Sequence, residues 1–142
     1  MSRSSVAPRD LAALILAAAV LAGCGGPPPP DDATSRAQIA KIVLEWHRYQ
    51  ADGNGKAWCA LLTRRSRYAQ GGDKCEQSIA RYRSFSAALR QALRETKVDS
   101  VVVTGDKATA QTHTTARVGG VTKRTPSATI PLRWEKGRWR VV

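Results

Sequence analysis

The period of the apolar side chains changes near residue 95, and this change constrains the fold more than any other feature of the sequence. Before it, apolar residues recur at helical spacing, at Ile39, Ile42, Val43, Trp46 and Tyr49 and again at Cys75, Ile79, Tyr82, Leu89 and Leu93. After it, β-branched residues run from Val98 to Val103, and small apolar and polar residues alternate from Ala108 to Val118. Helices followed by an antiparallel meander predict an α+β fold.

The helical half has readable helix starts and stops. Ser35 followed by Gln38 fits a capping box, which predicts Ser35 as the N-cap of the first helix. Asp73 followed by Glu76 suggests a second N-cap of the same kind. The expected elements are a helix from 35 to the turn at 52–55, a short helix at about 56–63, a loop at 69–73, and a helical stretch from 73 to about 94 that breaks near 84–86.

The second half predicts an antiparallel sheet. In its long alternating segment, one side carries Ala108, Ala110, Thr112, Thr114 and Ala116, and this alternation predicts a half-exposed strand. The expected strands are 98–103, 108–118, 122–134 and 139–142, joined by turns at 104–107, 119–120 and 136–137. Pro126 and Pro131 weaken the third strand and predict an edge position or a bulge there.

The N-terminus is predicted to be an export signal, residues 1–23. Arg3 and Arg9 precede an uninterrupted apolar run from Leu11 to Leu21. A helix of that length reaches roughly 16 Å, about half of a bilayer core. The run is therefore too short to span a membrane and has the length of a signal-peptide core.

The segment Leu21-Ala22-Gly23-Cys24 resembles the lipobox of bacterial lipoproteins. The resemblance implies cleavage before Cys24, lipid chains on that cysteine, and a location at the cell membrane facing outside the cytoplasm. The alternative is an ordinary signal peptide with an incidental cysteine. Residues 24–33 are expected to form a tether, stiffened by Pro27 to Pro30, which favour polyproline II. The folded domain is then expected to span residues 34–142.

Two cysteines remain once Cys24 is assigned to lipid. An even number in an oxidising compartment predicts a disulfide between Cys59 and Cys75. The alternatives are two free thiols, or a metal pair completed by His47 or His113. The sequence has no CxxC or HxxxH spacing that would support a metal site, so we expect no metal and no cofactor.

The chain is strongly basic, with a formal net charge of +12. For an exported protein we expect anionic lipid or cell-wall polymer, and not nucleic acid, as the polyanion that it meets. Arg64-Arg65-Ser66-Arg67 is the one dense cluster of basic residues. The alternative is a solvated cationic surface without a partner.

Over residues 34–142 the chain resembles the NTF2-like (SnoaL-like) superfamily, specifically its bacterial lipoprotein members of unknown function. The markers are Trp46, Tyr49, Asp52-Gly53, Trp58-Cys59-Ala-Leu-Leu-Thr63, Cys75, Val98-Asp-Ser-Val-Val-Val-Thr-Gly105-Asp106, Ile130-Pro131-Leu132 and Gly137-Arg138-Trp139-Arg140. The resemblance implies a cone in which helices pack on a curved antiparallel sheet and often leave a pocket between them.

An apolar pocket for a small ligand is expected between helices and sheet. Its candidate lining residues are aromatic or polar side chains of both halves: Trp46, Tyr49, Trp58, Tyr82, His113 and Trp134. The alternative is that these aromatic side chains fill a small core.

Superfamily enzymes use a carboxylate or a His–Asp pair in the cone. Candidates here are Asp99, at the start of a strand, and His113, which could face solvent or the cone; His47 is expected to be exposed. We expect no catalytic residue and no enzyme, but an exported, membrane-anchored binding or accessory domain at the cell envelope. The alternative is an enzyme of the isomerase, dehydratase or hydrolase type acting in the cone pocket.

Overall fold

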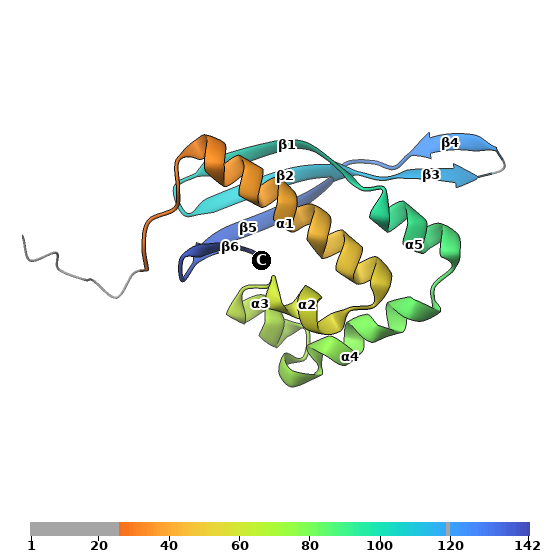
Figure 1. Ribbon diagram of the computed structural model, residues 1–142, viewed down its shortest axis with the longest axis horizontal. Coiled ribbons are helices and arrows are strands. Elements are labelled where there is room, and N and C mark those ends of the chain that lie inside the picture. Colours follow the sequence, from red (N-terminus) through yellow and green to blue (C-terminus); the bar gives the residue numbers. More distant parts are fainter. Residues whose placement is uncertain (1–25, 119) are drawn as a thin grey trace, which may run out of the picture.

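The computed structural model describes residues 26–118 and 120–142, and they form an α+β fold with the helices before the sheet (Figure 1). The helices are α1 (Asp32–Asp52), α2 (Gly55–Ala60), α3 (Arg64–Ala69), α4 (Cys75–Ala80) and α5 (Ala87–Arg94), with short 3-10 turns η1 (Gly72–Lys74) and η2 (Arg81–Ser84). The strands are β1 (Lys97–Thr104), β2 (Lys107–His113), β3 (Thr115–Val118), β4 (Val121–Arg124), β5 (Ala128–Glu135) and β6 (Arg138–Val141). The predicted fold class, N-terminal helices packed on an antiparallel sheet, is confirmed.

The first helix begins earlier than its capping box predicted. Asp31 is the N-cap of α1, and its carboxylate accepts from the backbone N–H of Thr34 at 3.0 Å. The prediction for Ser35 is wrong, because Ser35 is buried within the helix and its hydroxyl donates to the carbonyl of Pro30. Two N-cap residues compete here, and the carboxylate of Asp31 adds a favourable charge at the positive end of the helix. The helix ends as expected at Gly53, whose φ of 61° suits glycine.

The connection between the second helix and α4 contains more helix than predicted. Thr63 caps the additional helix α3 by accepting from the N–H of Ser66. Asp73 does not cap α4, since the cap position is Lys74 and no side chain bonds there. The predicted break near residues 84–86 is confirmed, and Ser86 caps α5 after it.

The main sheet is antiparallel with strand order β1-β2-β5-β6. The predicted half-exposed strand is confirmed in β2, and its buried side carries Ala108, Ala110 and Thr112. Each of the two long predicted strands is interrupted, at Thr114 and at residues 125–127 around Pro126. The outer parts, β3 and β4, form a separate two-stranded sheet that projects from the body (Figure 1).

The core lies between the helices and one face of the main sheet. It consists of Ile39, Val43, Trp58, Cys59, Leu62, Cys75, Ile79, Ala108, Ala110, Ile130, Leu132, Trp139 and Val141. The predicted disulfide between Cys59 and Cys75 is present and joins α2 to α4 inside this core. The two helices approach so closely that a Cβ on Gly55 would lie 2.1 Å from the carbonyl oxygen of Glu76, so that position requires glycine.

Residues before α1 contact the β5–β6 turn. The indole N–H of Trp134 donates to the carbonyl of Pro27 at 2.6 Å, and Gly26 lies against the backbone of Lys136. The end of the predicted tether therefore packs on the domain. The predicted signal peptide and Cys24 lie outside the described residues. Within the described part of the chain, no helix is long and apolar enough to cross a bilayer.

Candidate functional site

The predicted pocket residues do not surround one cavity. Trp46 stacks on Trp58 with ring centroids 5.3 Å apart, and Trp134 meets Trp139 edge-on at 5.5 Å. Together with Tyr49 and Tyr82, these side chains lie in or against the core. The sixth, His113, is the last residue of β2, directly after the buried Thr112, and lies on the opposite side of the strand. The aromatic side chains therefore pack the interior, which was the alternative to a pocket.

The expectation that His47 is exposed is wrong. Both ring nitrogens are buried without a hydrogen-bond partner, and the ring lies edge-on to Trp46 with centroids 4.9 Å apart. The reason is that α1 is covered on more than one side, since it contacts α2 and α5 as well as the sheet. Burial lowers the pKa of His47 to about 4, so the ring is neutral at pH 7.

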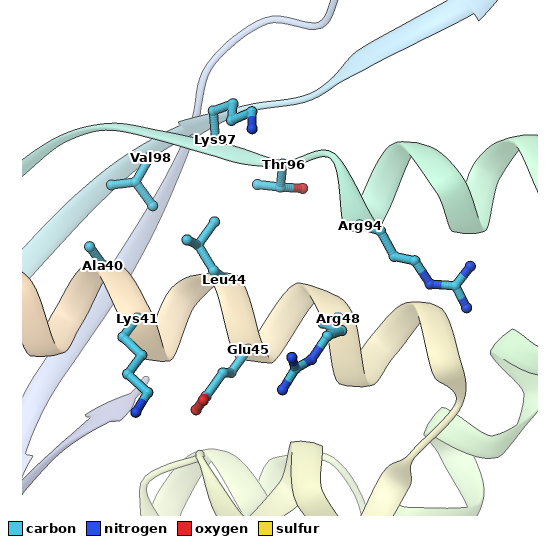
Figure 2. Close-up of a pocket in the computed structure, with 9 residues that line it drawn as sticks. All are labelled: Ala40, Lys41, Leu44, Glu45, Arg48, Arg94, Thr96, Lys97 and Val98. Carbon is cyan, nitrogen blue, oxygen red and sulfur yellow. The ribbon is translucent and has the colours of Figure 1, made fainter.

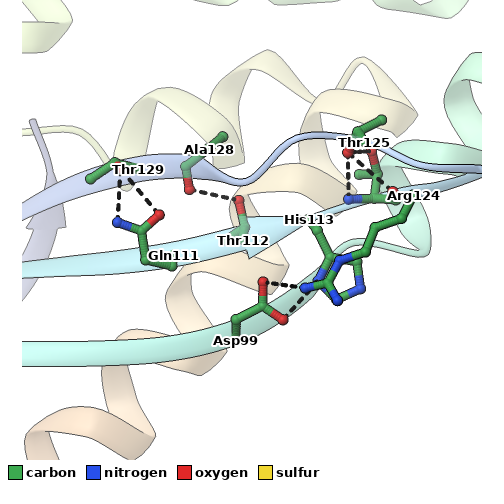
Figure 3. Close-up of polar contacts among 9 residues, drawn as sticks. Asp99, Gln111, Thr112, His113, Arg124, Thr125, Ala128 and Thr129 are labelled. Atoms are coloured by element: carbon green, nitrogen blue, oxygen red, sulfur yellow. Dashed lines mark hydrogen bonds and ion pairs between the residues drawn. The ribbon is translucent and has the colours of Figure 1, made fainter.

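Asp99 and His113, the two candidate catalytic residues, do meet, together with Arg124 (Figure 3). A β-bulge between Val98 and Ser100 shifts the register of β1 and directs Asp99 to the side of β2 that carries His113. One carboxylate oxygen lies 2.8 Å from His113 Nδ1, and the other accepts from Arg124 Nη2 at 2.9 Å. The cluster ties β1, β2 and β4 together on the face of the sheet away from the core.

The charges in this cluster satisfy one another. His113 Nδ1 lies 2.8 Å from Asp99 Oδ1, which only accepts, and 3.0 Å from Arg124 Nη2, which only donates, so its role as donor or acceptor depends on the tautomer of the ring. The hydrogen bond with His113, followed by the charge of Arg124, lowers the pKa of Asp99 below its ordinary value. Asp99 is therefore ionised at neutral pH, and both its oxygens are engaged by residues of the chain. These contacts orient His113, whose side chain is 14% exposed. They lie outside the interior of the cone, where the resemblance implies that a catalytic pair would be.

A groove of about 750 Å³ runs between α1 and the start of β1 (Figure 2). Ala40 and Leu44 point from α1 toward Thr96 and Val98, and form an apolar floor (Figure 2). Leu44 is 43% exposed, so part of this apolar floor is open to water. The volume lies within the range of small-molecule sites.

Charged side chains surround this apolar floor. The remaining lining residues are Lys41, Glu45, Arg48, Arg94 and Lys97. Arg94 is neutralised by Asp52, with Nη2 and Oδ1 2.6 Å apart. Lys41, Arg48 and Lys97 have no such ion pair with a described residue, so the groove has a positive balance against Glu45. The residues that line this groove form no recognisable pattern in the sequence, because α1 and β1 come together only in the folded chain.

Among the described residues, no group of three or more histidine, cysteine or acidic side chains could hold a metal ion. No known family model matches the chain. No curated protein matches it. Among solved structures, the chain is similar to an NTF2-like protein with a cystatin-like fold from Novosphingobium aromaticivorans, at 17% sequence identity and a TM-score of 0.47, over 78% of this chain and 79% of that one.

Proposed function

We propose that the chain is an exported lipoprotein of the NTF2-like superfamily whose domain binds an amphiphile with an anionic end in the groove between α1 and β1. Membership in the superfamily is proposed from the order of the sequence markers and from helices that precede a curved sheet. Anchoring is proposed from the lipobox-like residues 21–24. The domain acts as a non-catalytic binding module at the cell envelope.

The observation that carries the binding proposal is the apolar floor of the groove with cations beside it. An apolar chain laid on Ala40, Leu44 and Val98 would remove their exposed surface from water, at about 25 cal/mol per Å². An anionic end could then pair with Lys41 or Lys97, which stand beside this floor. A ligand without a charged end would gain only the burial of apolar surface and not the ion pair.

Leu44→Asp is expected to weaken binding of a long-chain fatty acid about tenfold or more, because the substitution removes the largest apolar contact and adds a like charge. The measurement is the rise in melting temperature when the fatty acid is titrated into the protein. Leu89→Asp is the matched control, since Leu89 on α5 is 45% exposed and does not line the groove. An equal rise in both variants, or no rise in the unmodified protein, contradicts the proposal.

Cys24→Ala is expected to remove the protein from the membrane fraction, or to leave it at precursor size, because the acceptor for lipid is lost. The measurement is membrane fractionation combined with the size of the product. Pro28→Ala, four residues later in the chain, is the control and should fractionate like the unmodified protein. A mature-size Cys24→Ala product that stays with the membrane contradicts the anchoring proposal.

Acid–base catalysis is a second candidate function, favoured by the contact of Asp99 with His113. Asp99 and Arg124 both contact Nδ1, which leaves Nε2 as the ring nitrogen that would exchange a proton with a substrate. For an enzyme, His113→Ala should abolish turnover of a substrate while the protein stays folded. We favour the binding module, because the cluster lies outside the groove and its partners already satisfy the carboxylate.

A further inference from the structure

A second groove, of about 320 Å³, lies between α3 and the β5–β6 hairpin. We call it the basic groove. Its charged lining residues are Arg64, Arg67, Lys136, Arg138, Arg140 and Glu135. The dense arginine cluster of the sequence thus meets basic residues that lie about 70 positions later in the chain.

Five cationic side chains and one carboxylate, that of Glu135, line the basic groove, so its charge balance is positive. None of its five cationic side chains forms an ion pair with a described carboxylate. Arg140 is held in place, because its Nη1 donates to the carbonyls of Ala60 at 2.7 Å and Leu62 at 3.1 Å. Burial, followed by the charge of Arg138, lowers the pKa of Arg140, and the charge of Glu135 opposes this shift.

The same groove lies beside the N-terminal end of the described chain. Lys136 lines the groove and also contacts Gly26, and the ring of Pro27 lies against Gly137. Trp134 fixes this contact through its bond to the Pro27 carbonyl. Cys24 precedes Gly26 by two positions in the sequence, and two residues of chain span at most about 7 Å. Lipid on Cys24 would therefore enter a bilayer next to the mouth of the basic groove.

We infer that the β5–β6 turn and α3 face the membrane that holds the anchor, and that the basic groove binds the phosphates of its anionic phospholipid headgroups. The inference rests on the proposed anchoring at Cys24. Guanidinium groups bind phosphate oxygens through paired, charge-assisted hydrogen bonds, and arginine supplies four of the five cations. The contact must be close, since the surface potential decays within about 8 Å at physiological salt. The contacts of Gly26 and Pro27 with the β5–β6 hairpin hold the groove close to the anchored end of the chain.

The test uses the lipidated protein, extracted from membranes and reconstituted into vesicles of phosphatidylcholine alone or with phosphatidylglycerol. Hydrogen exchange of the backbone amides in α3 and the β5–β6 turn is the readout. We expect exchange to slow several-fold only in the vesicles that contain phosphatidylglycerol, and we expect this slowing to be lost in Arg64→Glu/Arg67→Glu. The matched control is Arg81→Glu/Lys123→Glu, which makes the same charge change at exposed residues of η2 and β4 that do not line the groove.

The outcomes separate this inference from the anchoring on which it rests. A protein that does not float with either vesicle fails the anchoring proposal. A protein that floats with both but shows no slowing dependent on phosphatidylglycerol overturns the inference. If the slowing of exchange is lost equally in Arg81→Glu/Lys123→Glu, the inference is also overturned. The effect would then depend on the net charge of the protein and not on the basic groove. Slowing by inorganic phosphate in detergent, without slowing in vesicles, assigns the groove to a free anion and overturns the membrane orientation.

Discussion

Replacing both Cys59 and Cys75 with alanine lowers the free energy of unfolding by about 3 kcal/mol, the amount expected for a loop of this length. The two cysteines are 16 positions apart, and both are almost fully buried. Without the bond, the unfolded chain gains conformational freedom, and the sulfur atoms leave unfilled space between α2 and α4. For a domain of this size the melting temperature should fall by roughly 10 °C or more.

Thermal unfolding with and without reductant measures this effect. Reduction of the unmodified protein should lower its melting temperature to near that of the double variant. The double variant is its own control, since reductant has no bond to break in it. The reductant must be able to reach the unfolded chain. If it then leaves the melting temperature of the unmodified protein unchanged, the disulfide contributes little to stability.

The second large effect is a loss of stability in acid that depends on His47. Its folded-state pKa of about 4 lies below the ordinary value of 6.5. Between these two values the unfolded chain binds a proton that the folded protein excludes, so the free energy of unfolding falls as the pH falls from 6.5 to 4. The full loss is about 3 kcal/mol, at 1.36 kcal/mol for each unit of pKa difference.

Urea unfolding at a series of pH values between 7 and 4 measures this dependence. His47→Leu should flatten the curve, because leucine fills the same apolar space and does not titrate. Tyr68→Leu is the control and should keep the slope of the unmodified protein, since Tyr68 is an exposed residue of α3 and its replacement leaves His47 in place. A slope that survives in His47→Leu would show that the effect does not come from His47.

Most of the sheet and the disulfide were predictable because their signals are local or follow from a count. The alternation from Ala108 onward predicted that β2 has one buried and one exposed side. The edge position or bulge predicted from Pro131 is wrong, since β5 pairs with β2 on one side and β6 on the other, in regular register with β2 at Pro131. The helical half was less predictable wherever two local signals competed. Asp31 and Ser35 are both good N-cap residues, and α3 carries three arginines in six residues with no apolar stripe, so no period marked it.

The candidate sites were less predictable, because each joins residues that are distant in the sequence. Leu44 lies on α1 but off the stripe that faces the core, and only the position of Val98 makes it the floor of a groove. Asp99 contacts His113 because of a β-bulge that no sequence pattern predicted. His47 was misassigned because one apolar stripe was read as the only buried side of α1, whereas helices also cover its flanks.

The bulge at Asp99 also has a consequence for self-association. The segment at Leu62 pairs with Val141 at the β6 edge of the main sheet, which leaves β1 as the open edge of that sheet among the described residues. An open edge can recruit further strands, and bulges and charges are features that oppose such recruitment. Because the bulge and the charged residues Lys97 and Asp99 occupy the first half of β1, ordered strand addition to the main sheet is restricted to the second half, where Val102 is exposed. Fibrillar aggregation through the main sheet should therefore start there.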